Sequence, residues 1–310
     1  MQDRTYYKIV YVLISYICPR MPAKVNAEAT NGPVPGCASQ WGGIWHQLQR
    51  VRSNDSCLFT RSQPGTLYQF WQRAYARDLI SFAQRHGCES FLELGCGRAT
   101  TSMYLADKGY RNISLVDLSR DAHRLAASNF NQMGLRLPPF ILADVRSSGL
   151  PSGSFDCIYN IGLLEHFDDP AEVLHETYRL LKPGGVVFMP IFPERTPTLA
   201  FFLRCALNPL SFARRWWRGV APDEHHIKRT IAPCTHYENL CIDTGFSWSE
   251  CMHYNPFPKV VRDSFYERKV VLSFYRMAEW IRNWKSRDFS FRTNAFSSVG
   301  YLLIAGKQAR

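Results

Sequence analysis

Apolar and polar positions along residues 64–192 alternate between two periods, one typical of strands and one typical of helices. Residues 66–87 carry apolar side chains at helical spacing, after a threonine and before a glycine, which predicts a helix. Short apolar runs follow near residues 90–94, 112–116, 139–143, 156–161 and 185–190. Helical patterns separate these runs, and the alternation predicts a parallel sheet covered by helices on both faces.

Two further β-rich runs near the C-terminus, 246–254 and 297–305, are expected to complete the sheet as an antiparallel pair. A helix-like stretch, 261–285, separates them. The fold class is therefore α/β, with a doubly wound, mostly parallel, seven-stranded sheet of Rossmann-like type. We expect an N-terminal extension and linker over 1–63, and a domain over 64–310 that carries a helical cap at 192–233 and a helical insertion at 255–296.

The first strand leads into a glycine turn, in the sequence FLELGCGRAT at residues 91–100. Gly95 and Gly97 allow a sharp turn and a close approach of the backbone to a ligand, and the helix that follows presents free N–H groups there. Thr100 stands where a dinucleotide fingerprint has its third glycine, and Glu93 precedes the turn. A cofactor with a cationic end and no phosphate, such as S-adenosylmethionine, fits these residues better than a pyrophosphate.

Asp117 ends the second strand, twenty residues after Gly97. An acid at this position accepts hydrogen bonds from ribose hydroxyls. The structural alternative is that the two glycines serve only a tight turn and that Asp117 caps the helix that begins near Ser119.

The chain resembles the class I S-adenosylmethionine-dependent methyltransferases over residues 66–192, and again near the C-terminus. The matching segments are ELGCG (93–97), VDLS (116–119), ADV (143–145), LPSGSFDCIYNIGLLEHF (150–167) and LLKPGGVVF (180–188). The resemblance implies S-adenosyl-L-methionine as cofactor. It implies a set of cofactor-binding residues: Glu93, Gly95, Gly97, Asp117, Leu118, Asp144, Val145, Asn160 and Tyr68.

Within this set, Asp144 and Val145 would contact the adenine, and Tyr68 would close over the methionine end. Asp144 has an alternative role as a solvated loop acid, and Tyr68 as a packing aromatic. The resemblance places the acceptor pocket just after the fourth strand, at residues 160–166.

Methyl transfer from a sulfonium is an in-line displacement, so catalysis consists mainly of positioning the acceptor. His166 is the candidate base, with His225 of the cluster DEHH (223–226) as a second candidate. His166 could instead orient the helix that follows it. No metal site is expected, because adjacent histidines cannot easily face one ion. The strand-four end, YNIG (159–162), lacks the Asn-Pro-Pro-Tyr loop of adenine methyltransferases, which argues against a nucleic-acid base as acceptor.

The formal net charge is +11, and it is unevenly distributed. Residues 61–199 carry 14 basic and 14 acidic side chains, whereas residues 200–310 carry 17 and 9. This surplus predicts contact with an anionic partner or, alternatively, a solvated basic surface. The cap segment TLAFFLRCALNPLSFARRWWRG (198–219) interleaves aromatic residues with arginines. It either packs its aromatic side chains on the sheet or makes a peripheral membrane contact.

Ten cysteines without paired spacing predict a reducing, cytoplasmic environment. The apolar run KIVYVLISYIC (8–18) is too short to span a bilayer. It remains open whether this run is a packing element, a membrane-surface anchor or a segment upstream of a start at Met21.

Together, the residues and the resemblance predict methyl transfer to an O, N or C atom of a small, apolar or lipid-like molecule. The alternatives are methylation of RNA or protein, and a non-catalytic binding protein on the same fold. The oligomeric state and the acceptor are not predicted by the sequence.

Overall fold

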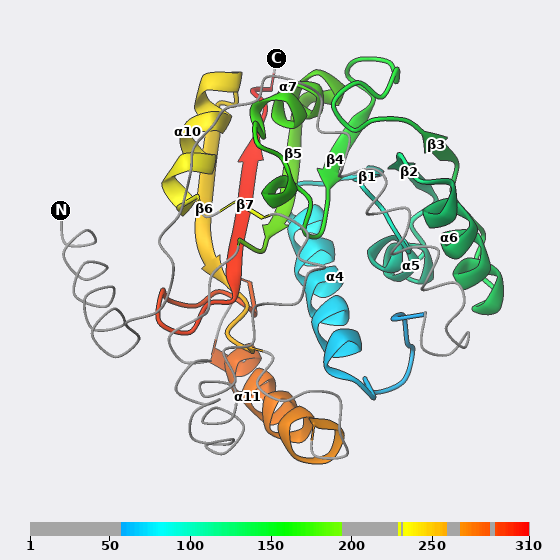
Figure 1. Cartoon of the computed structure of the whole chain (residues 1–310), viewed down its shortest axis with the longest axis vertical. Helices are drawn as coiled ribbons and strands as arrows, with labels where there is room; N and C mark the ends of the chain where they lie inside the picture. Colours follow the sequence, from blue (N-terminus) through cyan, green and yellow to red (C-terminus); the bar gives the residue numbers. More distant parts are fainter. Residues whose placement is uncertain (1–56, 194–228, 231, 259–266, 286–288, 310) are drawn as a thin grey trace, which may run out of the picture. The chain divides into compact units, whose positions relative to one another are not determined.

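The computed structural model of the protein describes residues 57–193, 229–230, 232–258, 267–285 and 289–309. Its centre is a seven-stranded sheet in the order β3-β2-β1-β4-β5-β7-β6 (Figure 1). The strands are β1 (Ser90–Leu94), β2 (Asn112–Asp117), β3 (Phe140–Leu142), β4 (Phe155–Tyr159), β5 (Leu181–Ile191), β6 (Trp248–Tyr254) and β7 (Gly300–Gly306). The first five pair in parallel, and β7 runs antiparallel between β5 and β6. The predicted fold class is confirmed.

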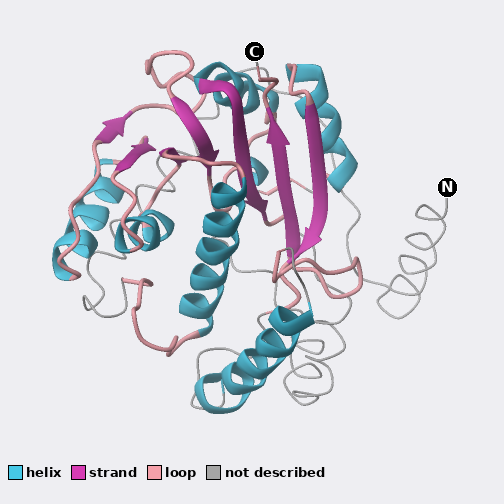
Figure 2. Cartoon of the chain, turned by 180° about the vertical axis from the view of Figure 1, so that it is seen from behind, coloured by secondary structure: helices cyan, strands magenta, loops and turns pink. Residues whose placement is uncertain are grey.

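Helices lie on both faces of this sheet (Figure 2). They are α4 (Leu67–Arg85), α5 (Thr100–Asp107), α6 (Arg120–Gln132), α7 (Ala171–Leu180), α10 (Cys234–Thr244) and α11 (Leu272–Lys285), with shorter turns η1 (Leu164–His166) and η2 (Glu267–Val271). Successive strand residues point to opposite faces, so Phe91 joins one apolar cluster and Leu92 the other. α4, α5, α6 and α11 pack into the first cluster, and α7 and α10 into the second.

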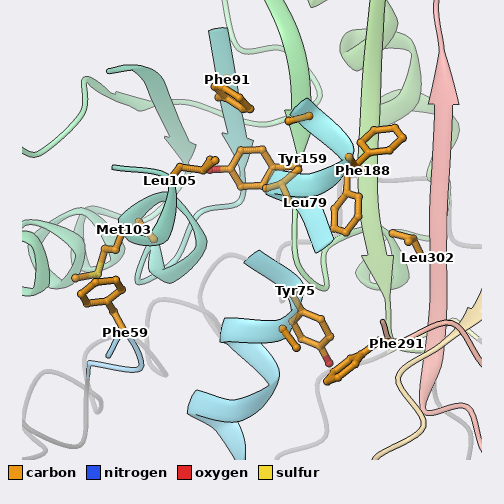
Figure 3. Packing of buried hydrophobic residues seen from close by; sticks show 14 of the residues in the cluster. Phe59, Tyr75, Leu79, Phe91, Met103, Leu105, Tyr159, Phe188, Phe291 and Leu302 are labelled. Atoms are coloured by element: carbon orange, nitrogen blue, oxygen red, sulfur yellow. The ribbon is translucent and has the colours of Figure 1, made fainter. Parts of the chain in front are cut away.

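Helix α4 begins and ends where the sequence predicts. The Thr66 side chain caps it by accepting a hydrogen bond from the Gln69 N–H at 3.2 Å, and Gly87 follows its end in a left-handed conformation. Cys57 and Phe59 lie before the expected domain start at residue 64, yet both are buried in the core. Figure 3 shows Phe59 beside Met103 of α5.

A buried acid on α4 ties the helix to distant parts of the chain. Asp78 is 3% exposed and accepts hydrogen bonds from the Tyr254 hydroxyl and the Ser290 hydroxyl, both at 2.7 Å. The backbone N–H groups of Ser290 and Phe291 also donate to it. Tyr75 packs edge-on against Phe291, as Figure 3 shows. α4 is therefore held by the last residue of β6 and by residues that follow this strand.

Several predictions concern residues outside the described ranges. They include the apolar run at 8–18, residues 194–228 of the cap and the start of the predicted helix at 261–285. Of that helix, residues 267–285 are helical in the structure. No helix within the described ranges has the length and apolar character needed to cross a membrane.

Candidate active site

The glycine turn between β1 and α5 adopts the conformation that its sequence predicts. Gly95 and Gly97 have φ angles of 62° and 50°, and Ala99 has 52°, all in the left-handed region. A Cβ atom on Gly95 would lie 2.7 Å from Cδ1 of Leu163. Backbone hydrogen bonds hold the turn, including one from the Cys96 N–H to the Val116 carbonyl at 3.1 Å. The loop is thus a fixed, narrow cradle at the carboxyl edge of the sheet.

Asp117 lies at the tip of β2 and is 8% exposed. Its Oδ2 accepts a hydrogen bond from the Gly97 N–H and its Oδ1 accepts one from the Ser119 N–H, both at 2.9 Å. The N-cap of α6 is Ser119, which accepts from Asp121 and Ala122, so the alternative that Asp117 itself caps this helix is wrong. Burial raises the pKa of Asp117. The carboxylate fastens the glycine turn to the second strand, and its contact with a ribose stays a prediction.

Glu93 lies on β1 and is 4% exposed. Its Oε2 accepts a hydrogen bond from the Ser102 hydroxyl at 2.5 Å and lies 3.5 Å from the Tyr159 hydroxyl. Burial raises the pKa of Glu93 to about 7, so the carboxyl group is about half protonated at neutral pH. A cation bound nearby would lower this pKa and favour the carboxylate.

Asp144 follows β3 and is engaged by a neighbouring arginine. Arg146 Nη2 lies 2.7 Å from its Oδ2, and the Arg146 N–H donates to its Oδ1 at 2.9 Å. The hydrogen bond from Arg146 lowers the pKa of Asp144. Val145, the next residue, is buried. Asp144 is thus a partly exposed loop acid that is paired with its neighbour, which agrees in part with the alternative role as a solvated loop acid. Its contact with adenine stays a prediction.

Two apolar side chains are exposed at the same edge. Leu118 is 53% exposed and Leu142 is 45% exposed, and Asp117 is the register partner of Leu142 between β2 and β3. Exposed apolar side chains at the carboxyl ends of adjacent strands suit a flat, apolar ring such as adenine. Sequence reasoning missed Leu142, although its position at the end of an apolar strand was a usable signal.

Asn160 follows β4 and is fully buried. Neither its side-chain nitrogen nor its side-chain oxygen has a hydrogen-bond partner in the structure as described. The hydroxyls of Thr100 and Thr101, at the start of α5, are buried and equally unsatisfied there. Because β1 and β4 are adjacent, these orphaned polar atoms border one edge of the sheet. Buried polar groups without partners are costly, so the site fits a polar ligand that supplies those partners.

The expected acceptor pocket continues into the turn η1. Glu165 is 1% exposed, and its Oε2 has no hydrogen-bond partner among the residues that the structure describes. Burial raises the pKa of Glu165 to about 7. The His166 side chain is 4% exposed, with Nε2 3.8 Å from Glu165 Oε1. Sequence reasoning did not single out Glu165, although it is an acid within an otherwise apolar stretch.

The other predicted residues have mixed outcomes. Tyr68 on α4 is 44% exposed and packs edge-on against Trp71. Its role over the cofactor stays a prediction. His225 lies outside the described residues. In the described part of the chain, no three His, Cys, Asp or Glu side chains gather in a way that could hold a metal ion.

A family model described as a methyltransferase domain matches residues 92–189, which run from β1 to β5. This match spans the glycine turn, both strand-end acids and the β4 end. Residues 92–189 therefore form a methyltransferase domain of the class I, S-adenosylmethionine-dependent type. S-adenosylmethionine is its cofactor. The groups that could hold it are the glycine turn, the exposed side chains of Leu118 and Leu142, and the unsatisfied polar atoms at Asn160, Thr100 and Thr101.

Curated relatives of this methyltransferase domain include two bacterial proteins named ubiquinone biosynthesis O-methyltransferase. The one from Caulobacter vibrioides is 28% identical over 146 residues, which cover 46% of this chain and 54% of that protein. The one from Nitrosococcus oceani is 29% identical over 184 residues, covering 59% and 72%. The chain thus spans little more than half of the first of these relatives.

Among solved structures, the [4+2]-cyclase SpnF is similar with a TM-score of 0.55. Its sequence is 17% identical, and the match covers 90% of this chain and 98% of SpnF. Likeness at this identity shows the fold alone. Since SpnF is named a cyclase, the fold does not by itself define the reaction.

Proposed function

We propose that the protein transfers the methyl group of S-adenosylmethionine to an oxygen atom of a small, apolar or lipid-like molecule. The names of the two curated relatives support oxygen as the acceptor atom. The apolar surroundings of the β4 end support a mainly apolar acceptor, since Leu164 is fully buried there and Leu163 and Phe167 pack on the core.

The observation that carries the proposal is the buried Oε2 of Glu165, which has no hydrogen-bond partner among the described residues. A hydroxyl acceptor must lose a proton as its oxygen is methylated, and a base with a pKa near neutrality is suited to take it. Glu165 has a pKa of about 7 and an oxygen without a partner among the described residues. His166, with Nε2 3.8 Å from Glu165, is the second candidate for this base.

The remaining chemistry is positioning. Cofactor binding supplies an electrophilic methyl group on a sulfonium, whose leaving thioether needs no acid. The residues of this chain then have three tasks: Asp117 binds the ribose, the glycine turn fixes the cofactor's place, and the β4 end holds the acceptor oxygen in line.

Calorimetric titration with S-adenosylmethionine and S-adenosylhomocysteine tests the cofactor part. We expect Asp117→Ala to weaken cofactor binding about a hundredfold, because the two hydrogen bonds that the ribose hydroxyls would donate to the carboxylate are lost. Asp243→Ala, which removes an exposed acid on α10, is the matched control and should bind as the wild type does. Equal binding by both variants would contradict the assigned role of Asp117.

Transfer of a labelled methyl group to phenolic and aliphatic hydroxyl compounds, with RNA and protein assayed beside them, then tests the reaction. Methylated product from a hydroxyl acceptor, absent when the cofactor is omitted, is the expected result. Product only with RNA or protein would favour the alternative substrates. Tight cofactor binding without transfer to any acceptor class would favour the non-catalytic alternative.

A further inference from the structure

Helix α11 has two apolar faces that point in opposite directions. On the inner face, Leu272 and Tyr275 are buried, and the Tyr275 hydroxyl donates to the Pro258 carbonyl at 2.8 Å. Glu279 lies on the same face and pairs with Arg77 of α4 at 2.8 Å. These contacts fix the helix on the fold and leave its other side outward.

The outer face carries what we call the α11 stripe. It consists of Val270, which lies in the preceding turn η2, and of Phe274, Met277, Trp280, Ile281 and Trp284 of α11. These six side chains are 49%, 59%, 54%, 68%, 40% and 79% exposed, in that order. Phe274, Met277, Ile281 and Trp284 are spaced by three or four residues, so they share one side of the helix. The Trp280 and Trp284 rings stack with their centres 6.4 Å apart. Half of the exposed large apolar side chains in the described part of the chain belong to this stripe.

The charges around the stripe are complementary to an anionic surface. Glu279 is the single acid in the sequence of α11, and it faces inward toward Arg77. Lys269 is exposed beside the start of the stripe. Residues 200–310 as a whole carry 17 basic and 9 acidic side chains. A second copy of the chain would cover the apolar rings but would bring like charges together.

We propose that the α11 stripe docks the protein on an anionic lipid bilayer, with the helix lying in the plane of the interface. Tryptophan and phenylalanine are favoured at the boundary between head groups and acyl chains, where aliphatic side chains beside them enter the apolar layer. Basic side chains at the helix border gain from the negative surface potential. The inference rests on described residues alone and does not depend on the proposed methyl acceptor.

Sedimentation of the full chain with vesicles tests the proposal. One set of vesicles contains phosphatidylcholine with about one third phosphatidylglycerol, and the other contains phosphatidylcholine alone. The wild type should bind the anionic vesicles more strongly, and high salt should weaken that binding. The double variant Trp280→Ser/Trp284→Ser should bind at least about tenfold more weakly, because the two most exposed rings no longer enter the interface.

Ile242→Ser is the matched control, since Ile242 is 54% exposed on α10 and lies outside the stripe. It should bind vesicles as the wild type does. Lys269→Glu, which leaves the rings in place, should reduce binding to the anionic vesicles only. Cofactor titration of each variant verifies that the methyltransferase fold is intact.

Three results would overturn the proposal. The first is wild-type protein that does not sediment with anionic vesicles. The second is a double variant that binds them as strongly as the wild type, which would assign membrane binding to another part of the chain. The third is a dimer, seen by analytical ultracentrifugation, that the double variant abolishes, because the stripe would then join two copies.

Discussion

The β1–β3 edge and the β4 end of the site differ in how their acids are satisfied. At the β1–β3 edge, Glu93, Asp117 and Asp144 all accept hydrogen bonds from the protein. At the β4 end, Glu165 keeps one oxygen without a partner, and Asn160 has none for its side chain, among the described residues. A satisfied group is ready before a ligand arrives, whereas an unsatisfied buried group costs stability until a ligand supplies its partner. The acids of the β1–β3 edge are thus in place before a ligand binds. The β4 end, and the start of α5 where the Thr100 and Thr101 hydroxyls are also unsatisfied, are completed by what binds there.

The largest expected effect comes from Glu165→Gln at the β4 end. If Glu165 takes the acceptor's proton, kcat should fall about 10²- to 10⁴-fold while cofactor affinity is retained. In the wild type, kcat/KM should rise with pH and level off above about 7, since only the ionised carboxyl group accepts a proton. His166→Gln is the comparison variant. A fall in kcat confined to His166→Gln would show that His166, and not Glu165, takes the acceptor's proton.

At the β1–β3 edge, Glu93→Gln should change how stability depends on pH. The pKa of Glu93 is about 7 in the folded protein, against an ordinary value of 4.5 that applies to the unfolded chain. Between these two pH values, the folded state therefore binds more protons than the unfolded state does. Wild-type stability therefore falls by up to about 3 kcal/mol as pH rises from about 5 to 8, and the variant escapes this loss. Urea unfolding at several pH values measures the difference. The exposed Glu89→Gln is the control, and parallel curves for Glu93→Gln and wild type would refute the assignment.

Asn160→Leu tests the cost of the unsatisfied amide. Removing both orphaned atoms should stabilise the free protein by about 1 kcal/mol and reduce the rise in Tm that cofactor produces. Asn129→Leu is the contrasting variant, because the Asn129 Nδ2 donates to the Arg98 carbonyl. That variant should destabilise. Thermal unfolding with and without S-adenosylhomocysteine distinguishes the two variants. A similar decrease in Tm for both would mean that the Asn160 side chain has hydrogen-bond partners in solution.

The smallest effect is expected for Asp144→Asn. In the ion pair between Asp144 and Arg146, the two side chains are 33% and 38% exposed, respectively. Water and salt therefore screen the attraction between them. We expect a loss of less than about 1 kcal/mol, which should disappear in concentrated salt. A salt-independent loss measured by urea unfolding would show that Asp144 has a structural role beyond this pair.

The strands, α4 and the glycine turn could be predicted because their signals are local. The apolar runs, the threonine cap and the two glycines each lie within the element whose conformation they determine. The state of Glu165 could not be predicted in this way, because it depends on residues distant in sequence. Its main-chain carbonyl accepts a hydrogen bond from the Thr230 N–H, 65 residues further along the chain. Likewise, the sequence of α11 has two apolar faces, and only its packing on α4 decides which one is left exposed.

Asp78 has a consequence for the order in which the protein folds. The hydrogen-bond donors to this buried acid follow it by 176 to 213 residues, at Tyr254, Ser290 and Phe291. β7 likewise enters the sheet between two strands made before it. During synthesis, α4 and the glycine turn leave the ribosome long before these partners do. The cofactor cradle therefore reaches its final stability only after β7 has emerged, and a nascent chain halted after β5 would expose an unpaired sheet edge to its surroundings.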